Sequence, residues 1–260
     1  MLNKKLKSFF KENGYVIIKN FFDKKKTKDI LSLLEYFSEK DFPPFINVHR
    51  FDYLLAQSCE KLINLSSVKE KADFIIKAMQ TSEKLKKYFL DQKINKYLTF
   101  LFGKRCIGLQ TQMIFKKPRT YYSKMAHRPH QDNSYGNNEK GLFFTAHIFL
   151  ENISKKNGTL YVYPGSHKMG TLDFEPHLSY RNKILKPGNE VNLSNIKLKK
   201  LDLNAKKGDF LVMDGLLVHG SYANKSKKLS RPIFCGCYIP RGEKFDVGKN
   251  ADRKAYEFAN

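Results

Sequence analysis

Residues 207–221 read KGDFLVMDGLLVHGS, and this stretch decides the fold class. Its apolar run at residues 210–213 lies between two turn signals, KGD at 207–209 and DG at 214–215, and predicts a short buried strand. His219 follows the second turn, so an imidazole stands close to the end of this strand. A short apolar strand between tight turns is typical of β-barrels and β-sandwiches.

The same pattern recurs on both sides of this stretch, from Cys106 onward. Strands are predicted at residues 107–115, 142–150, 159–163 and 233–239, with further turn signals such as NG at 157–158 and PG at 164–165. Several short strands with regular turns predict a mainly β fold, a barrel or sandwich that includes the jelly roll. We expect the polar residues 183–200 to form a long surface insertion.

The first third of the chain is predicted to be mainly helical. Helical patterns cover residues 4–12, which end at Asn13-Gly14, residues 24–39 after Asp23, and most of residues 68–102. One early strand is predicted at the β-branched residues 15–18. We therefore expect a single domain over residues 1–260, with residues 1–105 as mainly helical support and residues 106–245 as the β core.

Three residues carry a metal-binding pattern. In His130-Gln131-Asp132 an imidazole and a carboxylate are two positions apart, so on an extended segment they project to the same side. His219 belongs to a distant strand region, and distant strands can face each other in a barrel. Two imidazoles and one carboxylate on one face of a metal leave the opposite positions open, which is the facial triad of non-haem Fe(II) oxygenases. His127 lacks this spacing and is the weaker ligand candidate.

Two residues near His219 fit a cosubstrate that carries a carboxylate. Arg231 stands at the start of the next predicted strand, and a guanidinium can hold a carboxylate through two hydrogen bonds. Ser221 points the same way as His219 on an extended segment and can donate from its hydroxyl. An iron triad with these two residues predicts a 2-oxoglutarate site. Gln112 shares a strand face with Gln110, and this face either points toward the cosubstrate and substrate or is solvated.

The order of these motifs resembles that of the phytanoyl-CoA dioxygenase family of Fe(II)/2-oxoglutarate oxygenases. The resembling stretches span nearly the whole chain: FKENGYVI at 10–17, HQD at 130–132, NGTL at 157–160 running into PGSH at 164–167, and KGD at 207–209 through HGS at 219–221 to Asn224 and Arg231. The resemblance implies a double-stranded β-helix with supporting helices. It also implies iron bound by His130, Asp132 and His219, and 2-oxoglutarate held by Arg231 and Ser221.

The resemblance further implies a reaction with dioxygen that hydroxylates a C–H bond and releases succinate and CO2. Related halogenases give up the carboxylate of the triad to admit chloride, so the presence of Asp132 favours hydroxylation. A Trp or another large residue often stands in family members where this chain has His147.

The net charge of +23 is spread along the chain, and only 8 of its 48 basic residues are Arg. A nucleic-acid surface would gather Arg among aromatic residues, so we expect a compositional origin and no specific nucleic-acid partner. One local basic cluster precedes the HxD motif: Lys116, Lys117, Arg119, Lys124 and Arg128. This cluster is either a solvated loop or a capture site for an anionic small molecule, such as a phosphate, phosphonate, acidic sugar or acyl-CoA.

The four cysteines are too scattered for a disulfide scaffold, and we expect neither a signal peptide nor a membrane span, since no apolar run of sufficient length occurs. We expect a reducing, cytoplasmic setting.

Two alternative functions stay open. A cupin-like metal-dependent isomerase or sugar-binding barrel would not need Arg231, and a nucleic-acid-directed demethylase is motivated by the charge. The motifs define neither the substrate nor the oligomeric state.

Overall fold

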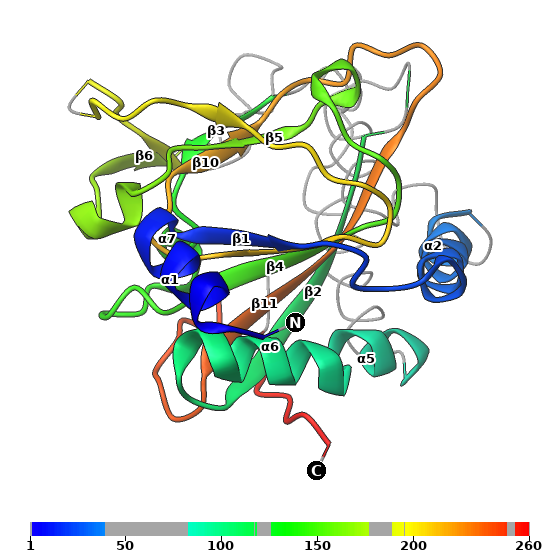
Figure 1. Cartoon of the computed structure of the whole chain (residues 1–260), viewed down its shortest axis with the longest axis horizontal. Helices are drawn as coiled ribbons and strands as arrows, with labels where there is room; N and C mark the ends of the chain where they lie inside the picture. Colours follow the sequence, from blue (N-terminus) through cyan, green and yellow to red (C-terminus); the bar gives the residue numbers. More distant parts are fainter. Residues whose placement is uncertain are drawn as a thin grey trace, which may run out of the picture.

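Two antiparallel sheets face each other in the computed structural model, which describes residues 2–39, 83–116, 118, 126–176, 189–194, 196–248 and 253–259 (Figure 1). The larger sheet has the strand order β1-β9-β4-β11-β2, the smaller sheet has the order β3-β10-β5-β8, and β6 pairs with β7. This arrangement confirms the predicted double-stranded β-helix, a jelly roll with flanking helices. The strands are β1 Tyr15–Ile18, β2 Cys106–Lys116, β3 His127–His130, β4 Phe144–Phe149, β5 Leu160–Val162, β6 Phe174–Pro176, β7 Asn189–Val191, β8 Leu201–Asp202, β9 Phe210–Met213, β10 His219–Ser221 and β11 Arg231–Pro240.

The longer helices belong to the N-terminal part of the chain, as predicted. The helices are α1 Lys4–Asn13, α2 Lys24–Glu39, α5 Glu83–Phe89, α6 Gln92–Phe102 and the short α7 Asn133–Gly136, with 3₁₀ turns η2 Lys155–Asn157 and η3 Ser166–Met169. Asn3 caps the start of helix α1, and its side chain accepts a hydrogen bond from the Leu6 amide at 2.9 Å. Gly14 caps the end of the helix with φ +76°. The part of the predicted helical region before residue 83 lies outside the described residues.

The helices pack on the outer face of the larger sheet, and α5 and α6 run beneath this sheet in Figure 1. Phe10 of α1 and Leu98 of α6 share one buried cluster with Phe144 of β4 and Phe210 of β9. Burial of this apolar surface is the main force that holds the helical layer on the sheet. Because the helices occupy the outer face, the inner face of the sheet is left for polar chemistry.

The strand register defines which side chains point to the inner face. Residues directly opposite each other in an antiparallel ladder share a face. One row of paired residues crosses four strands of the larger sheet. It consists of Leu211 of β9, His147 of β4, Cys235 of β11 and Gln112 of β2. Leu211 belongs to the apolar cluster between the two sheets, so this row faces the interior. The register therefore places Gln112 on the inward face, which is the first of the two alternatives left open by the sequence.

Where the structure describes the expected surface insertion at residues 183–200, its residues are exposed or half-buried apart from Val191. Strand β7 pairs with β6, and Val191 is buried in a cluster with Tyr161, Tyr163 and Val218. Val191 attaches this segment to the smaller sheet together with Leu193 and Ile196, which pack against the same cluster, because burial of apolar side chains removes them from water. Residues 183–188 lie outside the described part of the chain.

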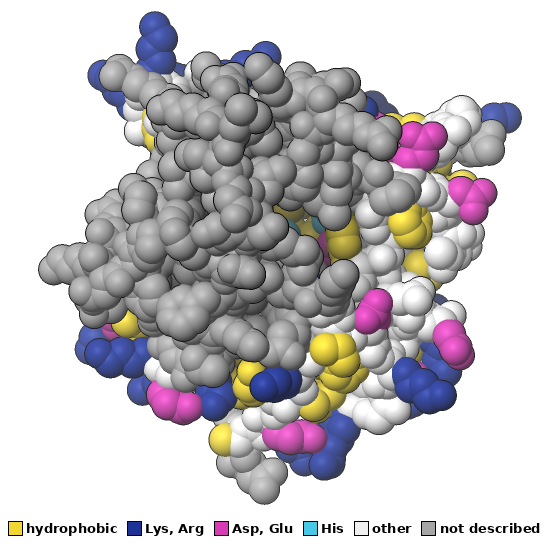
Figure 2. Space-filling model, turned by 180° about the vertical axis from the view of Figure 1, so that it is seen from behind, with side chains coloured by type: hydrophobic (Ala, Val, Ile, Leu, Met, Phe, Trp, Pro, Cys, Tyr) yellow, Lys and Arg dark blue, Asp and Glu magenta, His cyan; other side chains and the backbone are white. Residues whose placement is uncertain are grey.

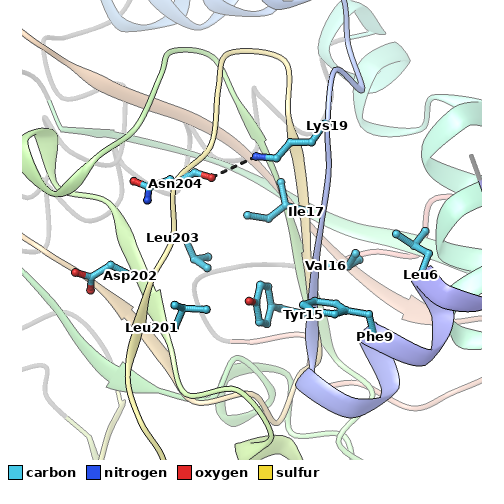
Figure 3. Close-up of a pocket in the computed structure, with 10 residues that line it drawn as sticks. All are labelled: Leu6, Phe9, Tyr15, Val16, Ile17, Lys19, Leu201, Asp202, Leu203 and Asn204. Atoms are coloured by element: carbon cyan, nitrogen blue, oxygen red, sulfur yellow. Dashed lines mark hydrogen bonds between the residues drawn. The ribbon is translucent and has the colours of Figure 1, made fainter.

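A pocket of about 440 Å³ opens at the edge where β1 of the larger sheet approaches β8 of the smaller sheet (Figure 3). Lys19 closes one end of it and donates a hydrogen bond to the backbone oxygen of Asn204 at 3.3 Å. The lining residues are Leu6, Phe9, Tyr15, Val16, Ile17, Lys19, Leu201, Asp202, Leu203 and Asn204. The lining contains no histidine, so this mostly apolar pocket is separate from the candidate site.

Candidate metal centre

His130, Asp132 and His219 converge between the two sheets. The Nε2 atoms of His130 and His219 lie 3.7 Å and 3.6 Å from Oδ1 of Asp132, and one ligand-type atom of each residue lies within 4.8 Å of the others. The two histidines are direct partners in the β3–β10 ladder, which explains why they meet. All three side chains are buried, with exposed fractions of 8%, 5% and 4%.

The extended geometry expected for the HxD motif is wrong at Asp132. His130 is the last residue of β3, whereas Asp132 has helical dihedrals, φ −62° and ψ −32°, and precedes α7. The chain turns at Gln131, whose buried amide donates to the backbone oxygens of Gly170 and Leu216 at 2.9 Å and 2.6 Å. These bonds fix the turn, so His130 and Asp132 converge through a strand-to-helix corner rather than through strand alternation.

Backbone contacts set the orientation of both imidazoles. Nδ1 of His130 lies 2.7 Å from the backbone oxygen of Arg128, and Nδ1 of His219 lies 3.1 Å from that of Leu217. A carbonyl oxygen can only accept, so each Nδ1 carries the hydrogen and each Nε2 presents its lone pair toward Asp132. This is the tautomer that a metal-binding histidine needs.

The electrostatics of the cluster keep the carboxylate ionised. Burial opposes ionisation of Asp132, but His219, His130 and a hydrogen bond from the Thr145 hydroxyl to Oδ2 together hold its pKa below the usual value. Burial and the neighbouring His219 lower the pKa of His130 to about 4. Two imidazoles and one carboxylate fit a divalent transition metal such as iron.

His147 lies on the inner face of β4, two residues along the strand from Thr145. Its side chain is 4% exposed, and among the described residues Nδ1 has no hydrogen-bond partner. Burial lowers the pKa of His147 to about 3, against the pull of the Asp132 charge. His147 is therefore a neutral polar group inside the cavity, next to the metal-type cluster.

Arg231 and Ser221 are both buried in the same interior, at 1% and 4% exposure. Arg231 begins β11, and its positive charge contributes to the lowered pKa of His147 and of His127, so the guanidinium lies near this cavity. Ser221 lies two residues beyond His219 in β10, as the sequence predicts. The structure thus brings the expected carboxylate-binding residues toward the metal-type cluster.

For two residues of the basic cluster, the structure excludes the solvated-loop alternative. Lys116 is fully buried, and its ammonium donates to Oγ of Ser221 at 3.0 Å and to the backbone oxygen of Tyr222 at 2.6 Å. Arg128 donates to both carboxylate oxygens of Glu190, at 2.7 Å and 2.6 Å. Neither cation belongs to a solvated loop, because the strand register turns Lys116 inward and Glu190 of β7 pairs Arg128. Lys117, Arg119 and Lys124 lie outside the described residues.

The remaining predicted residues take lesser positions. Gln110 is buried and accepts a hydrogen bond from Nε of Arg253 at 3.0 Å. His127 lies in β3 opposite Ser221 and is not part of the metal-type cluster. His167 contacts the backbone oxygen of Lys11 through Nε2 at 3.1 Å, so it joins the turn after β5 to α1. Sequence reasoning missed Thr145, because its contact with Asp132 depends on strand register.

The cavity is accessible from the side opposite to the view of Figure 1. Figure 2 shows histidine and acidic side-chain atoms at the bottom of a hollow in that face. A concave site with a few convergent polar groups is the usual form of a small-molecule pocket.

Comparison with known proteins identifies the family. The sequence model of the family described as phytanoyl-CoA dioxygenase matches residues 10–233. The chain belongs to the phytanoyl-CoA dioxygenase family. This family is one of Fe(II)/2-oxoglutarate oxygenases, which confirms the resemblance drawn from the motifs.

Curated relatives agree with this membership. Peroxisomal phytanoyl-CoA dioxygenase of Mus musculus is 28% identical over 231 residues, which are 88% of this chain and 66% of the mouse protein. The Homo sapiens enzyme is 26% identical over 230 residues, again 88% of this chain and 66% of the human protein. The chain thus spans just under two thirds of the length of these relatives.

The fold also matches a solved structure. The epimerase SnoN in complex with Fe³⁺, alpha ketoglutarate and nogalamycin RO superposes with a TM-score of 0.69 and 14% identity, over 99% of this chain and 95% of that one. This likeness supports the jelly-roll architecture.

Among the described residues, no helix is both long and apolar enough to cross a membrane.

Proposed function

We propose that this chain is an Fe(II)- and 2-oxoglutarate-dependent oxygenase that hydroxylates a C–H bond of a small molecule and releases succinate and CO2. The observation that carries the proposal is the buried cluster of His130, Asp132 and His219, whose ligand-type atoms lie within 4.8 Å of one another. Family membership supports the same chemistry.

Each site residue has a role that follows from its position. His130, Asp132 and His219 hold the iron, with the imidazoles bound through Nε2 and the carboxylate through Oδ1. Arg231 and Ser221 bind the far carboxylate of 2-oxoglutarate, and Gln112 lines the same inner face as a further hydrogen-bond partner. The bound iron supplies the activation of dioxygen coupled to oxidative decarboxylation of the cosubstrate.

The presence of Asp132 supports hydroxylation, because this carboxylate fills the position that a halide would need. The alternatives of a cupin-like isomerase, a sugar-binding barrel or a nucleic-acid-directed demethylase are not favoured, since the chain belongs to the phytanoyl-CoA dioxygenase family.

An anionic substrate is the finer part of the proposal. Its support is the printed name of the mammalian relatives, since a coenzyme A ester is an anion. Arg128 of the basic cluster is paired with Glu190, so this cation does not support an anionic substrate. We further propose a reducing, cytoplasmic setting. Its support is that Cys106, Cys235 and Cys237 are free and buried. We also propose a single domain over the whole chain, because the helices and the larger sheet share one core.

An anaerobic titration tests the proposal. Metal-free protein is mixed with Fe(II) and then with 2-oxoglutarate, and the weak visible charge-transfer band of the chelate is recorded. We expect the band in the wild-type protein and its loss in Asp132→Ala. Iron binding without a band in the wild-type protein would contradict the 2-oxoglutarate part of the proposal and move the cupin-type alternative forward.

A further inference from the structure

Lys116 is a buried cation beside a second buried cation. Its side chain is 0% exposed, and it is the direct ladder partner of Arg231, which is 1% exposed. Lysine is almost never fully buried in a protein unless an interaction compensates for the lost hydration. Burial and the charge of Arg231 hold the pKa of Lys116 well below its usual value, so the protonated form of this ammonium is penalised in the structure as it stands.

The position of Lys116 is fixed by contacts from two directions. Its ammonium donates to Ser221 Oγ at 3.0 Å and to the backbone oxygen of Tyr222 at 2.6 Å. Asn224 donates from Nδ2 to the backbone oxygens of Lys116 and Leu229, at 2.9 Å and 2.8 Å, and so ties the end of β2 to the segment after β10. The ammonium is therefore held on the same strand that carries His219.

The spacing along β10 suits a short dicarboxylate. Ser221 lies two residues beyond His219, which corresponds to about 6.5 Å along a strand. This separation is comparable to the length of an extended five-carbon chain. A molecule bound to the metal at one end would therefore bring its far carboxylate close to Ser221, Lys116 and Arg231.

We propose that Lys116 is a third anchor for the far carboxylate of 2-oxoglutarate, together with Arg231 and Ser221. This inference rests on the proposed function. Because Ser221 Oγ already accepts from Lys116, its own hydrogen is directed elsewhere and can be donated to the carboxylate. The carboxylate, in turn, separates the two cations and favours the protonated form of the ammonium.

The test compares two keto acids on the full-length protein loaded with Mn(II), which binds like Fe(II) but does not start turnover. 2-Oxoglutarate carries the far carboxylate, and 2-oxovalerate has the same carbon chain without it. The dissociation constant of each is measured by calorimetry for the wild-type protein and for Lys116→Met. We expect Lys116→Met to weaken 2-oxoglutarate binding about tenfold or more, as for loss of an ion-paired hydrogen bond, and to leave 2-oxovalerate binding within about twofold.

Lys140→Met is the matched control, because Lys140 is an exposed lysine that pairs with Glu243 at 2.9 Å. It should bind both keto acids like the wild-type protein. Lys116→Gln is the second variant if Lys116→Met does not fold, and the same selective loss is expected of it. Equal binding of 2-oxoglutarate by wild type and variant would overturn the inference, and so would an equal loss of both keto acids. If the wild-type protein binds neither keto acid, the proposed function itself fails.

Discussion

The hydroxyl of Thr145 donates a hydrogen bond to Oδ2 of Asp132, while the other carboxylate oxygen faces His130 and His219. Thr145 lies on β4 of the larger sheet, and Asp132 lies at the corner between β3 and α7. This contact joins the larger sheet to the metal-type cluster and leaves Oδ1 as the oxygen that faces both imidazoles. Such support behind a ligand commonly sets its orientation and its affinity for metal.

Removal of the Thr145 hydroxyl should weaken metal binding without loss of the fold. Thr145→Val keeps the shape of the side chain but leaves Oδ2 of Asp132 without this donor. We expect the affinity for Mn(II), measured by electron paramagnetic resonance titration, to fall about 10- to 100-fold. Thr145→Ser retains the hydroxyl and should bind nearly as well as wild type. Equal affinity of the valine variant would show that the contact does not orient the carboxylate.

Substitution of any of the three cluster residues should abolish metal binding. His130→Ala, Asp132→Ala and His219→Ala each remove one ligand from a three-residue set. We expect the variants to retain less than about one hundredth of wild-type turnover and to lose the single bound metal ion in metal analysis. His127→Ala is the control, since His127 lies outside the cluster. Loss of the metal in His127→Ala with its retention in His130→Ala would reverse the ligand assignment.

The glycine between His219 and Ser221 should be essential for the site geometry. A Cβ at Gly220 would lie 2.7 Å from the backbone oxygen of His127 and 2.4 Å from the Tyr161 hydroxyl. Gly220→Ala should therefore push β3 away from β10 and separate His130 from His219. We expect at least about a tenfold loss of Mn(II) affinity in the same titration.

Gly242→Ala is the comparison for that substitution. Gly242 has φ +87°, but no atom lies within 4 Å of a Cβ built there. Gly242→Ala should lower the melting temperature through backbone strain and leave metal affinity unchanged. Wild-type metal affinity in Gly220→Ala would show that the two strands can absorb the methyl group.

His147 should make the metal-free protein less stable in acid. Burial lowers its pKa from 6.5 to about 3, so between these values the unfolded chain binds a proton that the folded protein does not. Stability therefore falls as the pH falls through this window, by about 1.4 kcal/mol per pH unit for one such group. Urea unfolding between about pH 5 and about pH 6.5 should show a shallower slope for His147→Phe than for wild type. Equal slopes would mean that His147 is protonated in the folded protein.

The fold was largely readable from the sequence because local signals agreed with each other. The Asn13-Gly14 stop predicted the end of α1, and the turns around residues 210–213 predicted β9 with the bounds that the structure has. The segment around Val191 was predicted as a surface insertion, and the burial of Val191 within it was not predicted. Burial depends on partners that are distant in the chain, which no local pattern contains.

The site was readable in its residue types and only in part in its geometry. His130, Asp132 and His219 were predicted together, but the helical corner at Asp132 was not, because it depends on bonds from Gln131 to Gly170 and Leu216. The inward direction of Lys116 followed from the ladder with β11, although its sequence neighbours suggested a basic loop.

The sequence by itself therefore determined the β architecture and the chemical groups available for a metal and a carboxylate. Turn residues, apolar periodicity and motif order are local properties, and they are present in the unfolded chain. Only the tertiary structure decided which of those groups meet: Thr145 behind Asp132, Arg128 against Glu190, and Lys116 beside Arg231. The physical reason is register, because a shift of one residue between paired strands would turn each of these side chains to the opposite face.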